Sequence, residues 1–355
     1  MSAILYYITG HGFGHAVRSS QVIRAVNKVR PDLTVHVRTT APEWLFPAAI
    51  VYSRQSIDVG IVQADSLHMD LERTFQRCRT LHENAAQFID EELRFIRDNH
   101  IGLVIGDIPP LCFEIAARAK VPSVAITNFT WSRIYRAYVD DYPQFAPLIN
   151  EMETFYEKTT LALALPYACG MEVFQHRQEI PWIARFSNLT KSQARAKFQL
   201  PDAETIVLLS FGGLGLNRLS LNKLSELREF FFVATGDEKK SGDNLVVLPE
   251  MQPQYHDLVQ AVDVVVTKPG YGIVADAMAH RVPVLYTDRG EFPEYPCLVQ
   301  ALSELATAEF IPQEELVSSN MGPYLKRLLA KNHYWPPTRL DGAARAAEKI
   351  IALLK

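Results

Sequence analysis

The strongest constraint on the fold is an alternation of short apolar runs with longer amphipathic stretches, which occurs twice along the chain. In the first series, residues 15–29, 71–99 and 111–119 predict helices, and the apolar runs predict strands at 3–9, 33–37, 57–62, 103–105 and 123–127. Strands that are apolar along most of their length are typical of sheets covered on both faces. We therefore expect a parallel sheet with right-handed βαβ connections.

The second series follows a stretch, 166–203, that carries three prolines and shows no clear periodicity, so we expect a linker there. After it, strands are predicted at 206–210, 230–235, 244–248, 262–267 and 283–287, and helices near 255–261, 273–280, 294–305 and 342–354. We predict an α/β protein with two Rossmann-like, doubly wound domains at 1–165 and 204–338. A length of 355 residues suits two domains.

Composition excludes several classes of protein. The net charge of −4 gives no reason to expect nucleic acid as a partner. The 4 cysteines form no C-x-x-C pair, so neither a zinc knuckle nor a thioredoxin-type site is expected. The N-terminus lacks the pattern of a signal peptide, and no apolar run approaches the roughly 18 residues of a spanning helix. We predict a cytoplasmic protein and leave peripheral contact with a membrane open.

Three glycine turns follow predicted strands, where parallel sheets bind ligands. The first, GHGFGH at 10–15, opens a helix whose N-terminus favours an anion. Its spacing differs from the dinucleotide motif G-x-G-x-x-G, and no acid occurs at 35–39, where a ribose-binding acid would lie. These two departures disfavour a Rossmann dehydrogenase.

The other two turns are SFGGLG at 210–215 and TKPGYG at 267–272. Their glycines allow the backbone to close over a phosphate. Asp276 follows the third turn, where its carboxylate would repel a phosphate but could accept hydrogen bonds from a ribose diol. A purely structural role, as a charge on the helix surface, is the alternative for Asp276.

With these motifs the sequence resembles GT-B fold glycosyltransferases. The resemblance rests on GHGFGH together with VVVTKPGYGIVADAMAHRVPVLY at 264–286. It extends to MurG and, through the segments at 106–131 and 207–215, to the glycosyltransferase-like N-terminal domain of L-arabinokinase. The resemblance implies two domains facing across a cleft, with the donor nucleotide sugar on the C-terminal one. It also implies that the final helix, 339–355, packs back on the N-terminal domain.

The resemblance assigns donor contacts by position. It implies that the third turn cradles the diphosphate, that Asp276 binds the ribose hydroxyls in place of the family's usual Glu, and that Glu294 contacts the donor sugar. A cation, either Lys268 or Arg289, can stabilise the leaving diphosphate. The full donor set is Gly212, Gly213, Gly215, Lys268, Gly270, Tyr271, Gly272, Asp276, Arg289 and Glu294.

Glycosyl transfer also needs a base for the acceptor hydroxyl. His15 has the right intrinsic pKa, His11 is a second candidate, and Asp107 is either a competing base or the group that orients a histidine. A base opposite the leaving group would give inversion. The predicted acceptor side is completed by Gly12, Gly14, Asn128 and Trp131, the last of which could stack on a sugar or belong to the core.

We expect a metal-independent enzyme without a cofactor, since the chain has no D-x-D triplet. The resemblance implies a UDP-sugar as donor, because the family commonly uses one. We expect the transferase to be of the hexosyl or N-acetylhexosaminyl type. The acceptor stays open among sugars, lipid-linked molecules and small molecules. Two alternatives remain: a nucleotide-sugar 2-epimerase and a non-catalytic nucleotide-sugar-binding protein.

Overall fold

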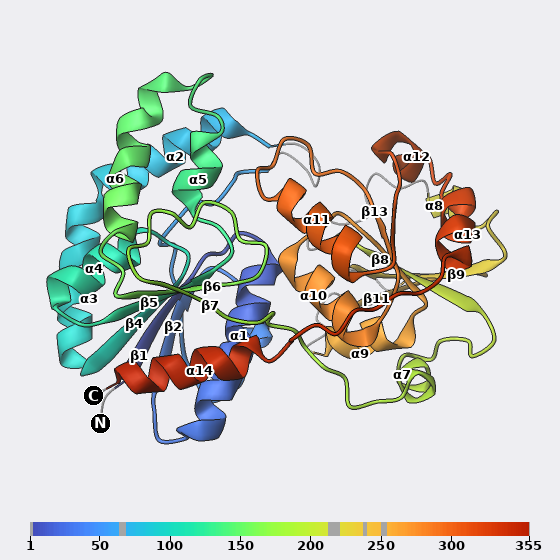
Figure 1. The fold of residues 1–355 in the computed structure, drawn as a ribbon, viewed down its shortest axis with the longest axis horizontal. Coiled ribbons are helices and arrows are strands. Elements are labelled where there is room, and N and C mark those ends of the chain that lie inside the picture. The colour runs from blue at the N-terminus through green and yellow to red at the C-terminus, as the bar shows by residue number, and fades with distance from the viewer. Residues whose placement is uncertain (1–2, 64–68, 212–220, 237–239, 250–253, 355) are drawn as a thin grey trace.

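The computed structural model describes residues 3–63, 69–211, 221–236, 240–249 and 254–354. The chain forms two α/β domains side by side, each built around a seven-stranded sheet with helices on both faces (Figure 1). The prediction of two doubly wound α/β domains is confirmed.

The N-terminal sheet is parallel throughout, in the strand order β3-β2-β1-β4-β5-β6-β7. Its central strands are buried along their length, because helices cover both faces. The strands are β1 (Ala3–Ile8), β2 (Val35–Thr39), β3 (Val51–Arg54), β4 (Ile101–Asp107), β5 (Ser123–Thr127), β6 (Leu161–Ala164) and β7 (Arg177–Glu179). The helices are α1 (Phe13–Val29), α2 (Leu71–Glu83), α3 (Ala85–Asp98), α4 (Leu111–Ala119), α5 (Trp131–Arg136) and α6 (Ala146–Tyr156), with 3-10 turns at Glu43–Leu45 and Pro143–Phe145.

The C-terminal sheet has the order β10-β11-β9-β8-β12-β13-β14, and its pairs are parallel except β10 with β11. The strands are β8 (Thr205–Ser210), β9 (Phe230–Gly236), β10 (Lys240–Ser241), β11 (Leu245–Pro249), β12 (Val264–Thr267), β13 (Val284–Tyr286) and β14 (Ala308–Phe310). The helices are α7 (Lys191–Phe198), α8 (Leu221–Leu224), α9 (Tyr255–Ala261), α10 (Tyr271–His280), α11 (Tyr295–Leu305), α12 (Gln313–Val317), α13 (Gly322–Ala330) and α14 (Gly342–Leu353).

Two predicted elements differ from the structure. The helix expected over 71–99 is divided into α2 and α3 at Asn84, which caps both. Residues 57–62, expected as a strand, run along the domain interface without regular structure, and β3 lies just before them. Gly60 explains the loss of the strand, because its φ of 64° turns the chain where it passes His11.

The stretch expected as a linker, 166–203, is more structured than the sequence suggested. It contains β7, which extends the first sheet, and α7, which packs against α9 of the second domain. The connection between the domains lies within it, between β7 and α7. That connection runs beside the returning chain, since the amide of Gly342 donates to the carbonyl of Trp182 at 3.0 Å. From there α14 packs against α1 of the N-terminal domain, as the red helix of Figure 1 shows.

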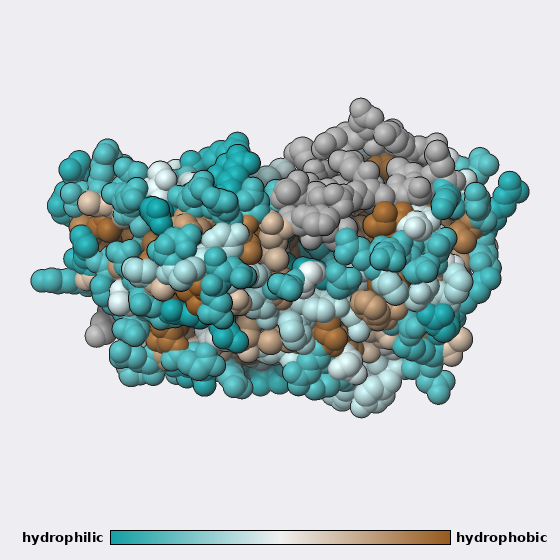
Figure 2. All heavy atoms as spheres, turned by 90° about the horizontal axis from the view of Figure 1, so that it is seen from above, coloured by the Kyte–Doolittle hydropathy of each residue, from teal (hydrophilic) through white to brown (hydrophobic). Residues whose placement is uncertain are grey.

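The surface is polar over most of the face seen in Figure 2, with apolar residues in small separate groups. Within the described parts of the chain, no helix has the length and the apolar character needed to cross a membrane.

Candidate active site between the two domains

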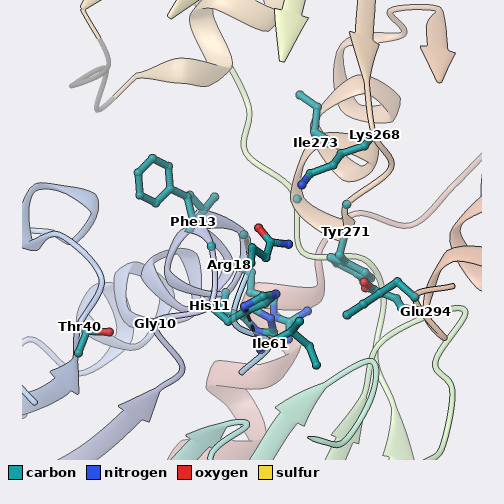
Figure 3. A pocket seen from close by; sticks show the side chains of 18 of the residues that line it. Gly10, His11, Phe13, Arg18, Thr40, Ile61, Lys268, Tyr271, Ile273 and Glu294 are labelled. Atoms are coloured by element: carbon teal, nitrogen blue, oxygen red, sulfur yellow. Dashed lines mark hydrogen bonds between the residues drawn. The ribbon is translucent and has the colours of Figure 1, made fainter. Parts of the chain in front are cut away.

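A cavity of about 1000 Å³ lies where the two domains meet. Two glycine turns form opposite sides of it: the loop between β1 and α1, and the loop between β12 and α10 (Figure 3). Both loops leave the carboxyl ends of central strands, where open parallel sheets bind ligands. Of the predicted site residues, those lining the cavity are His11, Gly12, Gly14, His15, Lys268, Gly270, Tyr271, Gly272, Arg289 and Glu294.

Two helix N-termini converge on this cavity. Helix α1 begins after Gly12 and α10 begins after Gly270, and neither glycine has a side chain that could cap the first N–H groups. The first turn of each helix also lacks an acidic residue. The turns are in contact, since a Cβ added to Gly272 would lie 3.6 Å from the Cα of Gly14. The cavity therefore combines two partial positive charges and two sets of N–H donors.

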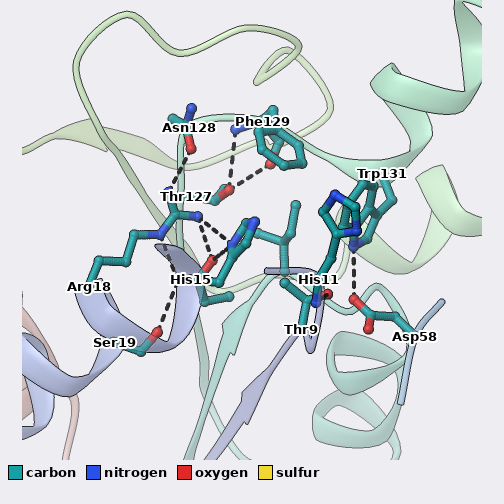
Figure 4. A network of polar contacts seen from close by, with 12 residues as sticks. Thr9, His11, His15, Arg18, Ser19, Asp58, Thr127, Asn128, Phe129 and Trp131 are labelled. Carbon is teal, nitrogen blue, oxygen red and sulfur yellow. Dashed lines mark hydrogen bonds and ion pairs between the residues drawn. The ribbon is translucent and has the colours of Figure 1, made fainter. Parts of the chain in front are cut away.

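The side chains of His15 and Asp107 form a buried pair at the N-terminal side of the cavity. Figure 4 shows His15 beside the guanidinium of Arg18. Nδ1 of His15 lies 2.8 Å from Oδ1 of Asp107. A carboxylate only accepts hydrogen bonds, so the neutral tautomer that donates to Asp107 carries its proton on Nδ1 and leaves the lone pair on Nε2. An Nη of Arg18, which can only donate, lies 3.0 Å from the same Nδ1 and favours the other tautomer, and the shorter contact with Asp107 is the one on which the assignment of His15 as base depends. Asp107 therefore orients His15, and the arrangement makes His15 the stronger candidate for the base.

Arg18, which the sequence analysis did not select, completes this pair. It is 2% exposed and donates to both carboxylate oxygens of Asp107, from Nε at 2.7 Å and from an Nη at 2.5 Å. Burial would raise the pKa of Asp107, but the charge of Arg18, helped by His15, outweighs burial and lowers the pKa to about 2. Burial, together with Arg18, lowers the pKa of His15, although Asp107 and Glu294 act in the opposite direction. His15 is therefore held neutral.

Asn128 and Glu294 connect the two domains. The Nδ2 group of Asn128 donates to Oε1 of Glu294 at 2.7 Å, and both side chains are buried. The other oxygen of Glu294 accepts from Arg289 at 2.8 Å. Asn128 was predicted on the acceptor side, but it lies behind the cavity wall as a bridge.

Asp276 has a different environment from the one predicted. Its side chain is 1% exposed and does not line the cavity, whereas Arg185 does. Arg185 donates to Asp276 from its backbone amide at 3.1 Å and from Nε at 2.9 Å, so both carboxylate oxygens are already engaged. A ribose contact by Asp276 would require this ion pair to open.

The aromatic residue Trp131 is in the core and not at the cavity, which corrects the idea that it stacks on a sugar. It is 1% exposed, packs edge-on against His11 with 5.3 Å between ring centroids, and donates from Nε1 to Asp58 at 2.8 Å. Asp58 does line the cavity, and burial raises its pKa to about 6. Asp58 was not predicted as a site residue, because it lies in the segment expected to form a strand.

His11 is a weaker candidate for the base than His15. Its Nδ1 accepts the amide N–H of Ile61 at 3.3 Å, so its proton lies on Nε2. Burial and the neighbouring positive groups lower the pKa of His11 to about 3. His11 therefore faces the cavity as a neutral donor.

Tyr271 contributes to the interface as well as to the cavity. Its ring stacks on Trp182 of the interdomain connection at 4.5 Å. The predicted donor residues Gly212, Gly213 and Gly215 lie outside the described residues. Among the residues that are described, no group of three or more His, Cys, Asp or Glu side chains is arranged to hold a metal ion.

Comparisons with known proteins confirm the resemblance. Residues 2–168 match the model of glycosyl transferase family 1. The chain is 28% identical over 335 residues to L-arabinokinase of Arabidopsis thaliana, covering 92% of this chain and 32% of that protein. It is 23% identical over 330 residues to an uncharacterized glycosyltransferase of Methanopyrus kandleri, covering 87% of this chain and 91% of that protein. The chain thus spans about a third of the arabinokinase.

Solved structures show the same architecture. UGT2 of Phytolacca americana, complexed with UDP-2fluoro-glucose and pterostilbene, superposes with a TM-score of 0.61 at 12% identity, covering 99% of this chain and 94% of that one. MurG of Acinetobacter baumannii superposes with a TM-score of 0.55 at 12% identity, covering 100% and 99%. The fold is therefore GT-B, and the chain is glycosyltransferase-like.

Proposed function

We propose that this chain is an inverting glycosyltransferase that moves a sugar from a nucleoside-diphosphate sugar to an acceptor hydroxyl. The observation that carries the proposal is the meeting of two uncapped helix N-termini and the His15–Asp107 pair at one cavity. The helix ends suit a diphosphate, and the histidine suits a hydroxyl that must lose its proton. The match to glycosyl transferase family 1 supports the same reaction class.

The donor is proposed to bind with its diphosphate at the N-terminus of α10. Lys268 and Arg289 line the cavity beside that helix end and can stabilise the charge of the leaving diphosphate without a metal ion. Glu294 lies on the same side of the cavity, and although Asn128 and Arg289 each engage one of its oxygens, a remaining lone pair can accept a hydrogen bond from a hydroxyl group of the sugar. We propose UDP as the nucleotide and a hexose or N-acetylhexosamine as the sugar, because UGT2 binds a UDP-hexose analogue in the same fold.

In the proposed reaction the acceptor, the leaving diphosphate, His15 and Asp107 each have a separate part. The acceptor oxygen attacks the anomeric carbon, the bond from that carbon to the diphosphate oxygen breaks, and the diphosphate keeps the electron pair. Nε2 of His15 takes the proton of the acceptor hydroxyl, and Asp107 holds the resulting imidazolium through Nδ1. Attack opposite the leaving group inverts the anomeric configuration.

Product analysis tests this proposal. Purified protein is incubated with UDP-sugars and candidate acceptors, and the nucleotide products are separated. Release of free UDP that requires both an acceptor and His15 is expected. An isomerised sugar nucleotide would indicate a 2-epimerase, and tight UDP-sugar binding without turnover would indicate a non-catalytic binding protein; either result contradicts the proposal.

A further inference from the structure

We propose that Arg18 and Asn128 are positioning residues that link the donor end of the cavity to the His15–Asp107 pair. The inference rests on the proposed function and adds a connection between its two halves. It comes from a continuous series of hydrogen bonds, buried from His15 to Glu294 and partly buried at Arg289, that crosses from one domain to the other. The groups in order are His15, Asp107, Arg18, Asn128, Glu294, Arg289 and the carbonyl of Pro269.

The first part of the series holds Arg18 rigidly. Two of its donors engage both oxygens of Asp107, and a third reaches Oδ1 of Asn128 at 2.7 Å. A guanidinium is planar and its donors have fixed directions, so moving the group that holds one donor tilts the whole fork. A displacement at Asn128 therefore changes the position of the Asp107 carboxylate that holds His15.

The side-chain amide of Asn128 has a fixed orientation between Arg18 and Glu294. Its oxygen faces a guanidinium that can only donate, and its Nδ2 group faces a carboxylate that can only accept. Of the two possible orientations of the amide, only the present one satisfies both neighbours. A movement of Glu294 in one domain therefore moves Asn128, and Asn128 in turn moves Arg18 in the other domain.

The series ends at the proposed donor site. One Nη of Arg289 donates both to Glu294 at 2.8 Å and to the carbonyl of Pro269 at 3.0 Å, in the turn before α10. A diphosphate bound at that turn competes with Glu294 for Arg289. Glu294 then becomes a stronger acceptor for Asn128, or it turns toward the donor sugar. Both changes alter the hydrogen bond that holds Arg18.

The charged groups that face His15 are Arg18, Asp107 and Glu294, and neutral His11 adjoins them. All three charges belong to the link, and Glu294 is the one that contacts Arg289 near the proposed donor site. Donor binding therefore changes the surroundings of His15 without touching it. In the absence of donor, Arg18 helps to keep the imidazole a weak base.

The experiment follows the proton on Nδ1 of His15 by NMR, with UDP as the probe. His15→Ala identifies the signal by removing it. In the wild type, saturating UDP is expected to shift this signal. In Asn128→Ala the shift is expected to disappear, with UDP affinity within about threefold of wild type and kcat lowered about 10- to 100-fold, as for a misplaced catalytic group.

A matched control is Asn244→Ala, which also removes a buried asparagine but lies among backbone carbonyls of the C-terminal domain, away from the link. It is expected to keep the full UDP response. A response of wild-type size in Asn128→Ala would show that bound UDP acts on His15 directly through its electric field and not through the hydrogen bonds. That result would overturn the link but leave the proposed function standing. Failure of UDP to bind the wild type would overturn the proposed donor and the link together.

If Asn128→Ala does not fold, Glu294→Gln carries the same test. This substitution keeps the shape of the side chain and removes the charge that Arg289 and Asn128 share. At saturating UDP it is expected to lose the response of the His15 signal. A full response in Glu294→Gln would overturn the proposal.

Discussion

Gly14 and Gly272 lie in different domains and face each other so closely that a Cβ added to Gly272 would be 3.6 Å from the Cα of Gly14. This contact brings the first turns of α1 and α10 to one cavity. The space at this point admits a single methyl group on Gly272, and a longer side chain there would press against the turn at Gly14.

The first prediction concerns this contact. Gly272→Ala should fold normally, because 3.6 Å is an ordinary van der Waals distance. Gly272→Leu should push the turns apart and weaken UDP binding about tenfold or more, since charge-assisted hydrogen bonds of about 1.5–3 kcal/mol are lost. Isothermal titration of both variants with UDP makes the measurement. Equal affinities for wild type and Gly272→Leu would mean that the two turns do not share a ligand.

The second prediction concerns pH. Burial and Arg18 lower the pKa of His15, so the neutral base persists as the pH falls, and the acid limb of kcat/KM should have its midpoint below 6.5. Asp58, with a pKa of about 6, titrates in the same range. A pH profile of Asp58→Asn separates the two groups. If the acid limb disappears in that variant, it belongs to Asp58 and the assignment to His15 fails.

The third prediction concerns the stability of the ion pair behind the base. Asp107→Ala leaves the buried charge of Arg18 without its partner, and unfolding should become about 3–5 kcal/mol easier. Since the pKa of Asp107 is lowered to about 2 in the folded protein, its stabilisation is present above the unfolded value near 3.8 and is lost as the pH falls toward 2. Urea denaturation at pH 7 measures the difference.

A matched substitution, Arg18→Met with Asp107 intact, leaves the opposite charge unpaired and should also destabilise. The double variant Arg18→Met with Asp107→Ala should recover part of the loss, because no buried charge remains unpaired. Strictly additive losses would contradict a direct coupling between the two side chains.

The fourth prediction concerns Asp276. Because Arg185 already engages both of its oxygens, Asp276→Ala should lower stability through the unpaired guanidinium and should leave UDP affinity unchanged or higher. Thermal unfolding and calorimetric titration of the same sample distinguish the effects. A tenfold loss of UDP affinity at unchanged stability would instead support a ribose contact by Asp276.

Much of the fold could be predicted from the sequence because its central strands are continuously apolar. β1, β4 and β5 lie within or around the predicted runs, since burial on both faces leaves no choice of residue. The edge strands β3 and β7 were not predicted. Their sequences, VYSR and RQE, are largely exposed and give no apolar pattern.

The candidate site could be predicted only where a local motif marks it. His15 and the turn at 267–272 follow strands and contain glycines, so the chain itself points to them. Arg18 lies one turn into a helix and resembles an ordinary surface arginine. Its importance depends on Asp107 and Asn128, which are distant in sequence, and no periodicity reveals such a contact. The pairing of Asp276 with Arg185 was hidden for the same reason.

The most direct measurement of the central claim is a crystal structure with UDP bound. The account predicts that oxygens of the diphosphate lie about 2.7–3.2 Å from backbone N–H groups at the start of α10, with Nε2 of His15 across the cavity. A diphosphate bound away from both glycine turns would contradict it.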